Sequence, residues 1–237
     1  MAIFRTKGDE TYDMLDRDLT TQPDEWKVEE SIERIDEQSW ESRYAHEAKL
    51  IQKHIDKHNI KKVLELGSGP GVLGDKISRQ NTDLSWTNVD KQAALDIHKE
   101  RKFKGRFLVK DLMNEFDLSD LDNDYDLIVA NDFLEHIANP SDVLYQAHKI
   151  TTENAKMFIS VPNWRMGHVF IYRGLFDYDN WLYTMRIHGW DVTTVSPANI
   201  QCQHLPKLDS ESAMPDELIQ SWNWYFCATR RTKTWKE

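Results

Sequence analysis

Val-Leu-Glu-Leu-Gly-Ser-Gly-Pro-Gly-Val-Leu-Gly, residues 63–74, is a short apolar strand with one acidic residue that runs directly into a glycine-rich turn. Gly67, Gly69 and Gly71 lack the Cβ atoms that would keep a ligand away from the backbone. The helix expected after the turn begins with backbone N–H groups that have no partner inside the helix. A strand, a glycine turn and a helix in this order predict a site for a nucleoside-containing ligand.

Two classes of cofactor bind at such turns, and the same residues match the pattern of both. Residues 67–71 read GxGxG, whereas residues 69–74 read GxGxxG, the pattern of dinucleotide-binding turns. Glu65 separates the two classes, because a carboxylate repels a pyrophosphate and attracts a cation. S-adenosylmethionine is such a cation, with a sulfonium and an α-ammonium group. The stretch resembles motif I of the class I S-adenosylmethionine-dependent methyltransferases.

Composition limits the class of protein. The chain has 237 residues, 40% of them hydrophobic, which is enough for one main α/β domain with its own core. A formal net charge of −10 disfavours nucleic acid as a partner, because polyanion binding needs clustered Lys and Arg. The sequence has no apolar run of about 18 residues that would predict a membrane span, and its first residues do not resemble a secretory signal. With only two cysteines, we expect a reducing, cytoplasmic location.

Strand and helix patterns alternate along most of the chain. Residues 1–25 show no sustained apolar period, and residues 26–59 show the spacing of one or two amphipathic helices. We therefore expect an N-terminal arm and helical cap over 1–59 and a cofactor-binding domain over 60–237. Strands are predicted over 61–66, 84–89, 106–109, 125–130 and 157–161, from about residue 190, and over 223–229. Helices are predicted over 72–79, over 141–150 and up to residue 187, and Ser141 is the predicted cap of the second.

This alternation predicts right-handed crossovers and an α/β, Rossmann-like, doubly wound sheet. The resemblance implies seven strands that are mostly parallel, with an antiparallel last strand.

The carboxyl ends of strands line the ligand site in such a sheet, and polar residues stand at these ends. Asp90 is suited to accept hydrogen bonds from both ribose hydroxyls, and Glu65 would face the methionine end. The resemblance implies that Asp111 and the Leu112 amide receive the adenine. The predicted cofactor-binding set is Glu65, Gly67, Ser68, Gly69, Gly71, Asp90, Lys91, Asp111, Leu112 and Asn131. Taken singly, each carboxylate could instead only cap the next turn.

Asn-Asp-Phe-Leu-Glu-His-Ile, residues 131–137, follows the fourth predicted strand. The segment resembles ubiquinone-biosynthesis O-methyltransferases and small-RNA 2′-O-methyltransferases, in which an acidic-x-x-Glu-His pattern can hold a divalent cation. Asp132, Glu135 and His136 are therefore candidate ligands for Mg²⁺, which would hold an acceptor hydroxyl as its alkoxide. His168 is a candidate fourth ligand on residue type alone. The interpretation that we favour is instead that Glu135 caps a helix and His136 lines the acceptor side.

Methyl transfer requires alignment of the reactants, exclusion of water and removal of a proton from the acceptor. His136 is the first candidate for the base, because an imidazole titrates near neutral pH, and Asp132 stands close to it in the sequence. Residues 164–189 are rich in Trp and Tyr. They are a candidate substrate insert over an apolar or ring-bearing acceptor, and ordinary packing against the sheet explains them equally well.

These features predict an S-adenosylmethionine-dependent methyltransferase that acts on the oxygen or nitrogen of a small molecule. The sequence does not indicate its oligomeric state. Two alternatives stay open. One is a nicotinamide-dependent oxidoreductase, which Glu65 disfavours. The other is a regulatory protein that binds S-adenosylmethionine without catalysis.

Overall fold

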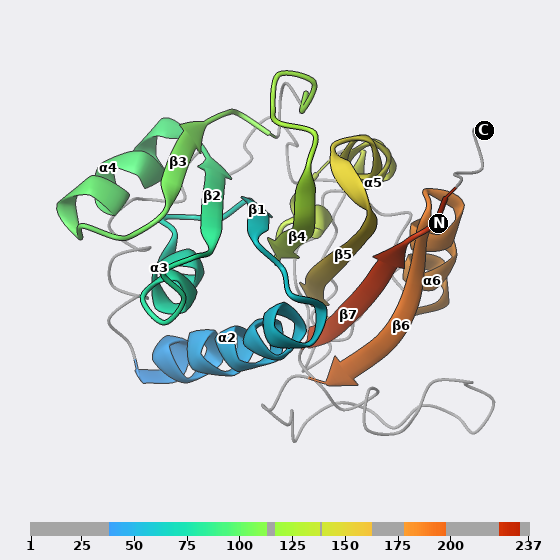
Figure 1. The fold of residues 1–237 in the computed structure, drawn as a ribbon, viewed down its shortest axis with the longest axis horizontal. Coiled ribbons are helices and arrows are strands. Elements are labelled where there is room, and N and C mark those ends of the chain that lie inside the picture. Colours follow the sequence, from blue (N-terminus) through green and yellow to red (C-terminus); the bar gives the residue numbers. More distant parts are fainter. Residues whose placement is uncertain (1–37, 113–116, 138, 163–177, 198–222, 233–237) are drawn as a thin grey trace, which may run out of the picture.

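The computed structural model describes residues 38–112, 117–137, 139–162, 178–197 and 223–232 (Figure 1). The predicted N-terminal arm, His168 and residues 164–177 of the aromatic insert lie outside these ranges.

The described strands form one seven-stranded sheet in the order β3-β2-β1-β4-β5-β7-β6 (Figure 1). They are β1 (Lys62–Leu66), β2 (Ser85–Asp90), β3 (Arg106–Val109), β4 (Tyr125–Asn131), β5 (Thr151–Pro162), β6 (Trp190–Pro197) and β7 (Asn223–Arg230). Neighbours from β3 to β5 are parallel, whereas β7 is antiparallel to both β5 and β6. The predicted Rossmann-like sheet with an antiparallel last strand is confirmed. β5 begins at Thr151, six residues before the predicted start at Met157. The prediction missed this part of the strand because its residues are mostly polar and carry no apolar signal.

Helices cover both faces of the sheet. They are α2 (Gln38–His58), α3 (Val72–Ser78), α4 (Gln92–Glu100), the 3₁₀ turn η1 (Leu134–His136), α5 (Pro140–Lys149) and α6 (Tyr178–Ile187). Because successive strand residues point to opposite faces, Leu127 packs with α2 and α3 while Ile128 packs with α5 and α6. Among the described residues, no helix combines the length and apolar character needed to cross a membrane.

The start of α5 differs from the prediction. The side chain of Asn139, not of Ser141, caps the helix, and its Oδ1 accepts a hydrogen bond of 3.3 Å from the N–H of Asp142. Pro140 occupies the first helical turn, where its fixed φ is already helical and its missing N–H costs nothing.

Helix α2 packs directly on the sheet. Ile51 and Ile55, one turn apart, are buried in the same hydrophobic cluster as Val63 of β1. One turn before Ile51, Glu47 lies on this buried stripe and is only 1% exposed. The helix therefore brings a carboxylate to the sheet. The division of the chain into a helical cap over 1–59 and a cofactor-binding domain over 60–237 stays a prediction.

Candidate functional site

The turn after β1 is the first component of the site. Gly67, Gly69 and Gly71 have φ values of 65°, 53° and 88°, in the left-handed region that favours glycine. A Cβ on Gly67 would lie 2.2 Å from the ring of Phe133, and one on Gly71 would lie 2.9 Å from Nδ1 of His98. A Cβ on Gly69 would have no atom of the described residues within 4 Å. Packing thus requires two of the glycines, and Gly69 is the position where the backbone faces open space.

Asp90, at the end of β2, is joined to this turn. Its Oδ2 accepts a hydrogen bond of 2.7 Å from the N–H of Gly69, and its Oδ1 accepts one of 2.7 Å from the N–H of Lys91. Burial raises the pKa of this carboxyl, and the two backbone hydrogen bonds oppose that rise. The structure therefore brings together the acid predicted for the ribose and the open glycine of the turn.

Glu65 lies on β1 and is 4% exposed. Its Oε2 accepts a hydrogen bond of 2.9 Å from Nε1 of Trp86 on β2. Burial raises the pKa of Glu65 to about 8, and the neighbouring carboxylates of Glu47 and Asp90 add to the rise. A buried acid in this environment is stabilised in its ionised form by any cation placed beside it.

The residues after β3 complete the cofactor side of the predicted set. The N–H of Lys110 donates to the carbonyl of Asp90 over 2.9 Å, which joins the ends of β2 and β3. Asp111 is exposed and close enough to Asp90 to influence its pKa. The side chain of Leu112 is 4% exposed and packs in the core. Asp111 therefore lies near Asp90, while the side chain of Leu112 serves the core.

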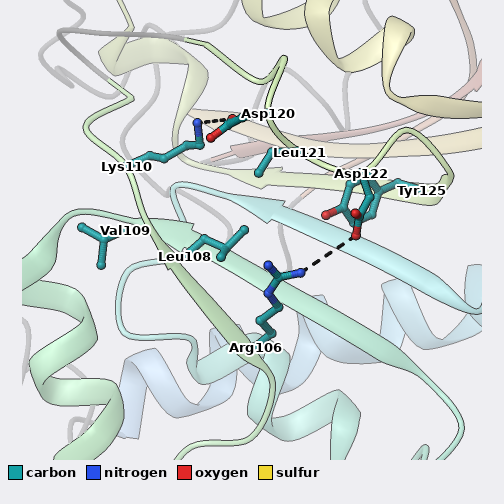
Figure 2. Close-up of a pocket in the computed structure, with 8 residues that line it drawn as sticks. All are labelled: Arg106, Leu108, Val109, Lys110, Asp120, Leu121, Asp122 and Tyr125. Atoms are coloured by element: carbon teal, nitrogen blue, oxygen red, sulfur yellow. Dashed lines mark hydrogen bonds and ion pairs between the residues drawn. The ribbon is translucent and has the colours of Figure 1, made fainter.

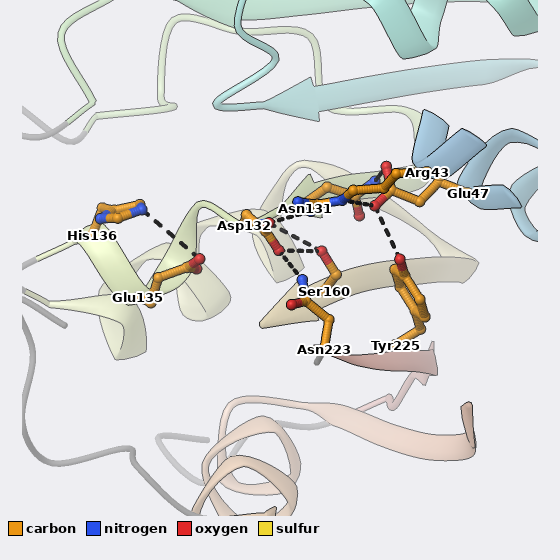
Figure 3. Close-up of polar contacts among 9 residues, drawn as sticks. All are labelled: Arg43, Glu47, Asn131, Asp132, Glu135, His136, Ser160, Asn223 and Tyr225. Atoms are coloured by element: carbon orange, nitrogen blue, oxygen red, sulfur yellow. Dashed lines mark hydrogen bonds and ion pairs between the residues drawn. The ribbon is translucent and has the colours of Figure 1, made fainter. Parts of the chain in front are cut away.

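A network of polar side chains joins α2 to the ends of β4, β5 and β7 (Figure 3). Oε1 of Glu47 accepts hydrogen bonds from Nε of Arg43, at 2.9 Å, and from the hydroxyl of Tyr225, at 3.1 Å. Oε2 of Glu47 accepts one from Nδ2 of Asn131 over 3.3 Å. Desolvation raises the pKa of Glu47, and the adjacent guanidinium of Arg43 opposes this. The buried carboxylate thus collects donors from a helix and two strands.

Asp132 is the second carboxylate of this network. Its side chain forms an ion pair with Arg43 and accepts hydrogen bonds from Oγ of Ser160, at 2.8 Å, and from Nδ2 of Asn223. Its backbone has φ 45°, which turns the residue out of the helical path that begins at Leu134. Asp132 therefore contacts Arg43, Ser160 and Asn223, as Figure 3 shows.

The predicted magnesium ligands do not converge. The Glu135 side chain is buried, and burial raises its pKa well above the usual range. Nε2 of His136 lies 3.8 Å from Oε1 of Glu135, and the imidazole is 25% exposed. Within the part of the chain that the structure describes, no group of three or more His, Cys, Asp or Glu is arranged to hold a metal ion. The prediction assumed that Asp132 and Glu135 share a helical face, whereas Asp132 has φ 45° and lies before the 3₁₀ turn that begins at Leu134.

A small hollow lies apart from these residues. Its volume is about 180 Å³, and it runs along β3 from Arg106 to Val109 and on to Lys110 (Figure 2). The charged side chains that line it form ion pairs with each other, Arg106 with Asp122 at 3.9 Å and Lys110 with Asp120. None of the predicted site residues lines it.

Sequence reasoning missed the network partners of Asp132 and Asn131. Arg43 and Glu47 carried a usable signal, because steps of four residues place them on the stripe that continues through Ile51 and Ile55. Charged residues on a buried helical stripe indicate a buried ion pair. Tyr225 gave no comparable signal, because it reaches the site only through the pairing of β7 with β5.

The comparison with protein families and curated proteins agrees with this geometry. Residues 39–170, more than half of the chain, match a family model described as a methyltransferase domain. The ubiquinone biosynthesis O-methyltransferase of Photobacterium profundum is 25% identical over 104 residues, which are 44% of this chain and 44% of that relative. The protein of the same name from Proteus mirabilis is 24% identical over 115 residues, 48% of this chain and 46% of the relative. The chain thus spans less than half the length of these curated relatives.

Solved structures share the fold. The PH0226 protein from Pyrococcus horikoshii OT3 has a TM-score of 0.61 and 13% identity, with 90% of this chain and 97% of that chain covered. The N-methyltransferase NodS from Bradyrhizobium japonicum WM9, solved in complex with S-adenosylhomocysteine, has a TM-score of 0.56 and 14% identity, with 91% and 96% covered. At these identities the similarity concerns the fold alone.

Proposed function

This chain belongs to the methyltransferase domain family, and from that premise we propose that it transfers a methyl group from S-adenosylmethionine to an oxygen or nitrogen of a small molecule. The observation that carries the proposal is the hydrogen bond of 2.7 Å from the N–H of Gly69 to Asp90. This bond holds an acid suited to ribose hydroxyls against the open part of the glycine turn.

The residues at the strand ends fit S-adenosylmethionine. Each carboxylate oxygen of Asp90 accepts one backbone hydrogen bond and retains capacity for a ribose hydroxyl. Buried Glu65 would neutralise positive charge at the methionine end. Oδ1 of Asn131 is buried and has no hydrogen-bond partner among the described residues, so it is available to an ammonium group. When bound, this cofactor supplies a methyl group that its sulfonium has already activated.

His136 is the residue that we assign to proton removal. Its imidazole is partly exposed, and its Nε2 lies 3.8 Å from Oε1 of the buried Glu135 carboxyl. Asp132 was the second candidate for catalysis. Its ion pair with Arg43 suits it better to hold α2 in place over the ends of β4 and β5.

The acceptor that we propose is a small molecule. The net charge of −10 disfavours a polyanion. The names of the similar proteins include both O-methyltransferases and an N-methyltransferase, so either atom is compatible with the family. A cytoplasmic location stays a prediction.

Calorimetry tests the cofactor, and isotope transfer tests the reaction. We expect S-adenosylhomocysteine to bind and NAD to give no heat. The isotopically labelled methyl group of S-adenosylmethionine should then be transferred to one member of a panel of phenols, hydroxy acids and amines. Transfer is measured with and without Mg²⁺. His136→Ala should retain affinity for S-adenosylhomocysteine and lose transfer, while His58→Ala on the exposed side of α2 should change neither. Tight binding of NAD without binding of S-adenosylhomocysteine would contradict the proposal.

A further inference from the structure

His98 joins helix α4 to the glycine turn. The residue is 6% exposed, and its Nδ1 lies 2.8 Å from the carbonyl oxygen of Pro70. A carbonyl oxygen can only accept, so Nδ1 carries the hydrogen and donates it. Pro70 stands between Gly69 and Gly71, the two glycines at the end of the turn.

The imidazole has a fixed position. Its centroid lies 5.0 Å from that of Phe107 and 6.1 Å from that of Phe103. The N–H of Phe103 also donates to the carbonyl of His98 over 3.1 Å. Rings packed in this way leave the side chain few alternative rotamers, so the direction of its N–H is determined by the core.

The turn is therefore attached at two successive residues to one segment. Asp90 accepts from the N–H of Gly69 at 2.7 Å, and His98 donates to the carbonyl of Pro70 at 2.8 Å. Both partners lie on the stretch from the end of β2 through α4. These two bonds orient the peptide unit between Ser68 and Gly69 and the one between Pro70 and Gly71, and these two units enclose the open backbone at Gly69.

We infer that His98 is a positioning residue for the cofactor: its hydrogen bond to Pro70 holds the glycine turn in the shape that binds S-adenosylmethionine. The inference rests on the proposed function. It assigns a role to a buried histidine that lies outside the predicted site set and that acts through the carbonyl of Pro70. The simpler interpretation of His98, as a core residue that adds only to stability, makes different predictions.

Three substitutions separate the two interpretations. The amide nitrogen of Asn takes the position of Nδ1 of His, whereas the amide nitrogen of Gln takes that of Nε2. His98→Asn therefore keeps a donor towards Pro70, and His98→Gln and His98→Leu do not. We expect the Gln and Leu variants to bind S-adenosylhomocysteine about tenfold more weakly, the effect of one lost buried hydrogen bond, and the Asn variant to bind almost as the wild type does.

Calorimetry with S-adenosylhomocysteine and the melting temperature without ligand are the two readouts. His54→Leu, on α2 and away from the turn, is the matched control and should not change affinity. Once an acceptor is known, the Gln variant should raise KM for S-adenosylmethionine with kcat little changed. The inference would be overturned if the Asn and Gln variants bound S-adenosylhomocysteine equally well and if the affinity of each variant fell only in proportion to its melting temperature.

A measurement on the wild type keeps the inference testable if a variant does not fold. A long-range ¹H–¹⁵N spectrum should show His98 as the Nδ1–H tautomer, and its signals should shift when S-adenosylhomocysteine binds. The opposite tautomer would overturn the inference. Wild-type protein that gives no heat with S-adenosylhomocysteine would overturn the proposed function as well, whereas binding by the wild type and all variants alike would overturn the role of His98 alone.

Discussion

The carboxylate of Asp90 holds the N–H of Gly69 at 2.7 Å, so the last residue of β2 determines the position of the turn that follows β1. Two segments far apart in the sequence thereby form one binding edge. Substitutions at this edge and in the polar network beside it should have separable effects on affinity and on stability.

Replacing Asp90 should weaken cofactor binding far more than it weakens the fold. Asp90→Ala removes an acceptor from Gly69 and from the ribose, and we expect affinity for S-adenosylhomocysteine to fall about 100-fold, the scale of two charge-assisted hydrogen bonds. Calorimetry measures the change. Asp96→Ala, at an exposed position of α4, is the control and should bind normally. An Asp90→Ala variant with wild-type affinity would remove Asp90 from the site.

Gly69→Ala and Gly71→Ala should differ in what they damage. At Gly69 the added Cβ meets no described atom, so the cost to folding is the backbone strain alone, about 1 kcal/mol, and the main loss is ligand affinity. At Gly71 the Cβ would lie 2.9 Å from His98 and 3.2 Å from Asn88, so the melting temperature should fall further. Thermal denaturation and calorimetry on both variants check this. Equal melting temperatures would contradict the packing role of Gly71.

Glu65 should make the unfolding free energy depend on pH. Its pKa is about 8 in the folded protein and near 4.5 when exposed, so between these values the folded state holds a proton that the unfolded state has released. The contribution of Glu65 to the free energy of unfolding is fully present below pH 4.5. It is lost as the pH rises towards 8, by at most about 1.4 kcal/mol per pH unit. Glu65→Gln cannot ionise and should lose less stability over this range. Urea unfolding of both proteins at several pH values measures the difference, and parallel curves would contradict the burial argument.

The ion pair between Arg43 and the Glu47 carboxylate should be strongly coupled. Arg43→Met leaves Glu47 buried without its cation, and we expect the free energy of unfolding to fall by about 3 kcal/mol. Adding Glu47→Gln should recover part of this loss, because a neutral amide costs less to bury than an unpaired carboxylate. Urea unfolding gives both values, with Lys53→Met on the exposed face of α2 as control. A double variant no more stable than Arg43→Met would contradict the expected coupling.

Local signals explain why most of the sheet could be predicted from the sequence. The strand before Gly67 is a short apolar run with one acidic residue, and the strand before Asp90 sets Leu84, Trp86 and Val89 among polar residues. These boundaries need no knowledge of the tertiary structure. Glu65, Asp90 and the glycines follow from the same local order. The resemblance to a known family supplied the antiparallel last strand, which periodicity alone did not indicate.

Long-range pairing explains what the sequence did not reveal. Tyr225 reaches Glu47 because β7 pairs with β5, with Ser160 opposite Tyr225. Asp132 was predicted on a helical face, but its φ of 45° is stabilised by the hydrogen bonds of its N–H and carboxylate to Ser160. No pattern in the sequence distinguishes His98, and only the distance of 2.8 Å from its Nδ1 to the carbonyl oxygen of Pro70 does so.

The place of β7 has a consequence for how the protein is made. β7 lies between β5 and β6 although it follows both in the chain, so a ribosome that has synthesised only as far as β6 has produced β5 and β6 without the strand that pairs with both. The phenol that donates to the Glu47 carboxylate is also translated long after that residue. The polar network around Glu47 can therefore be completed only after β7 has left the exit tunnel and paired with β5, and until then the nascent chain presents an open strand edge on which chaperones act.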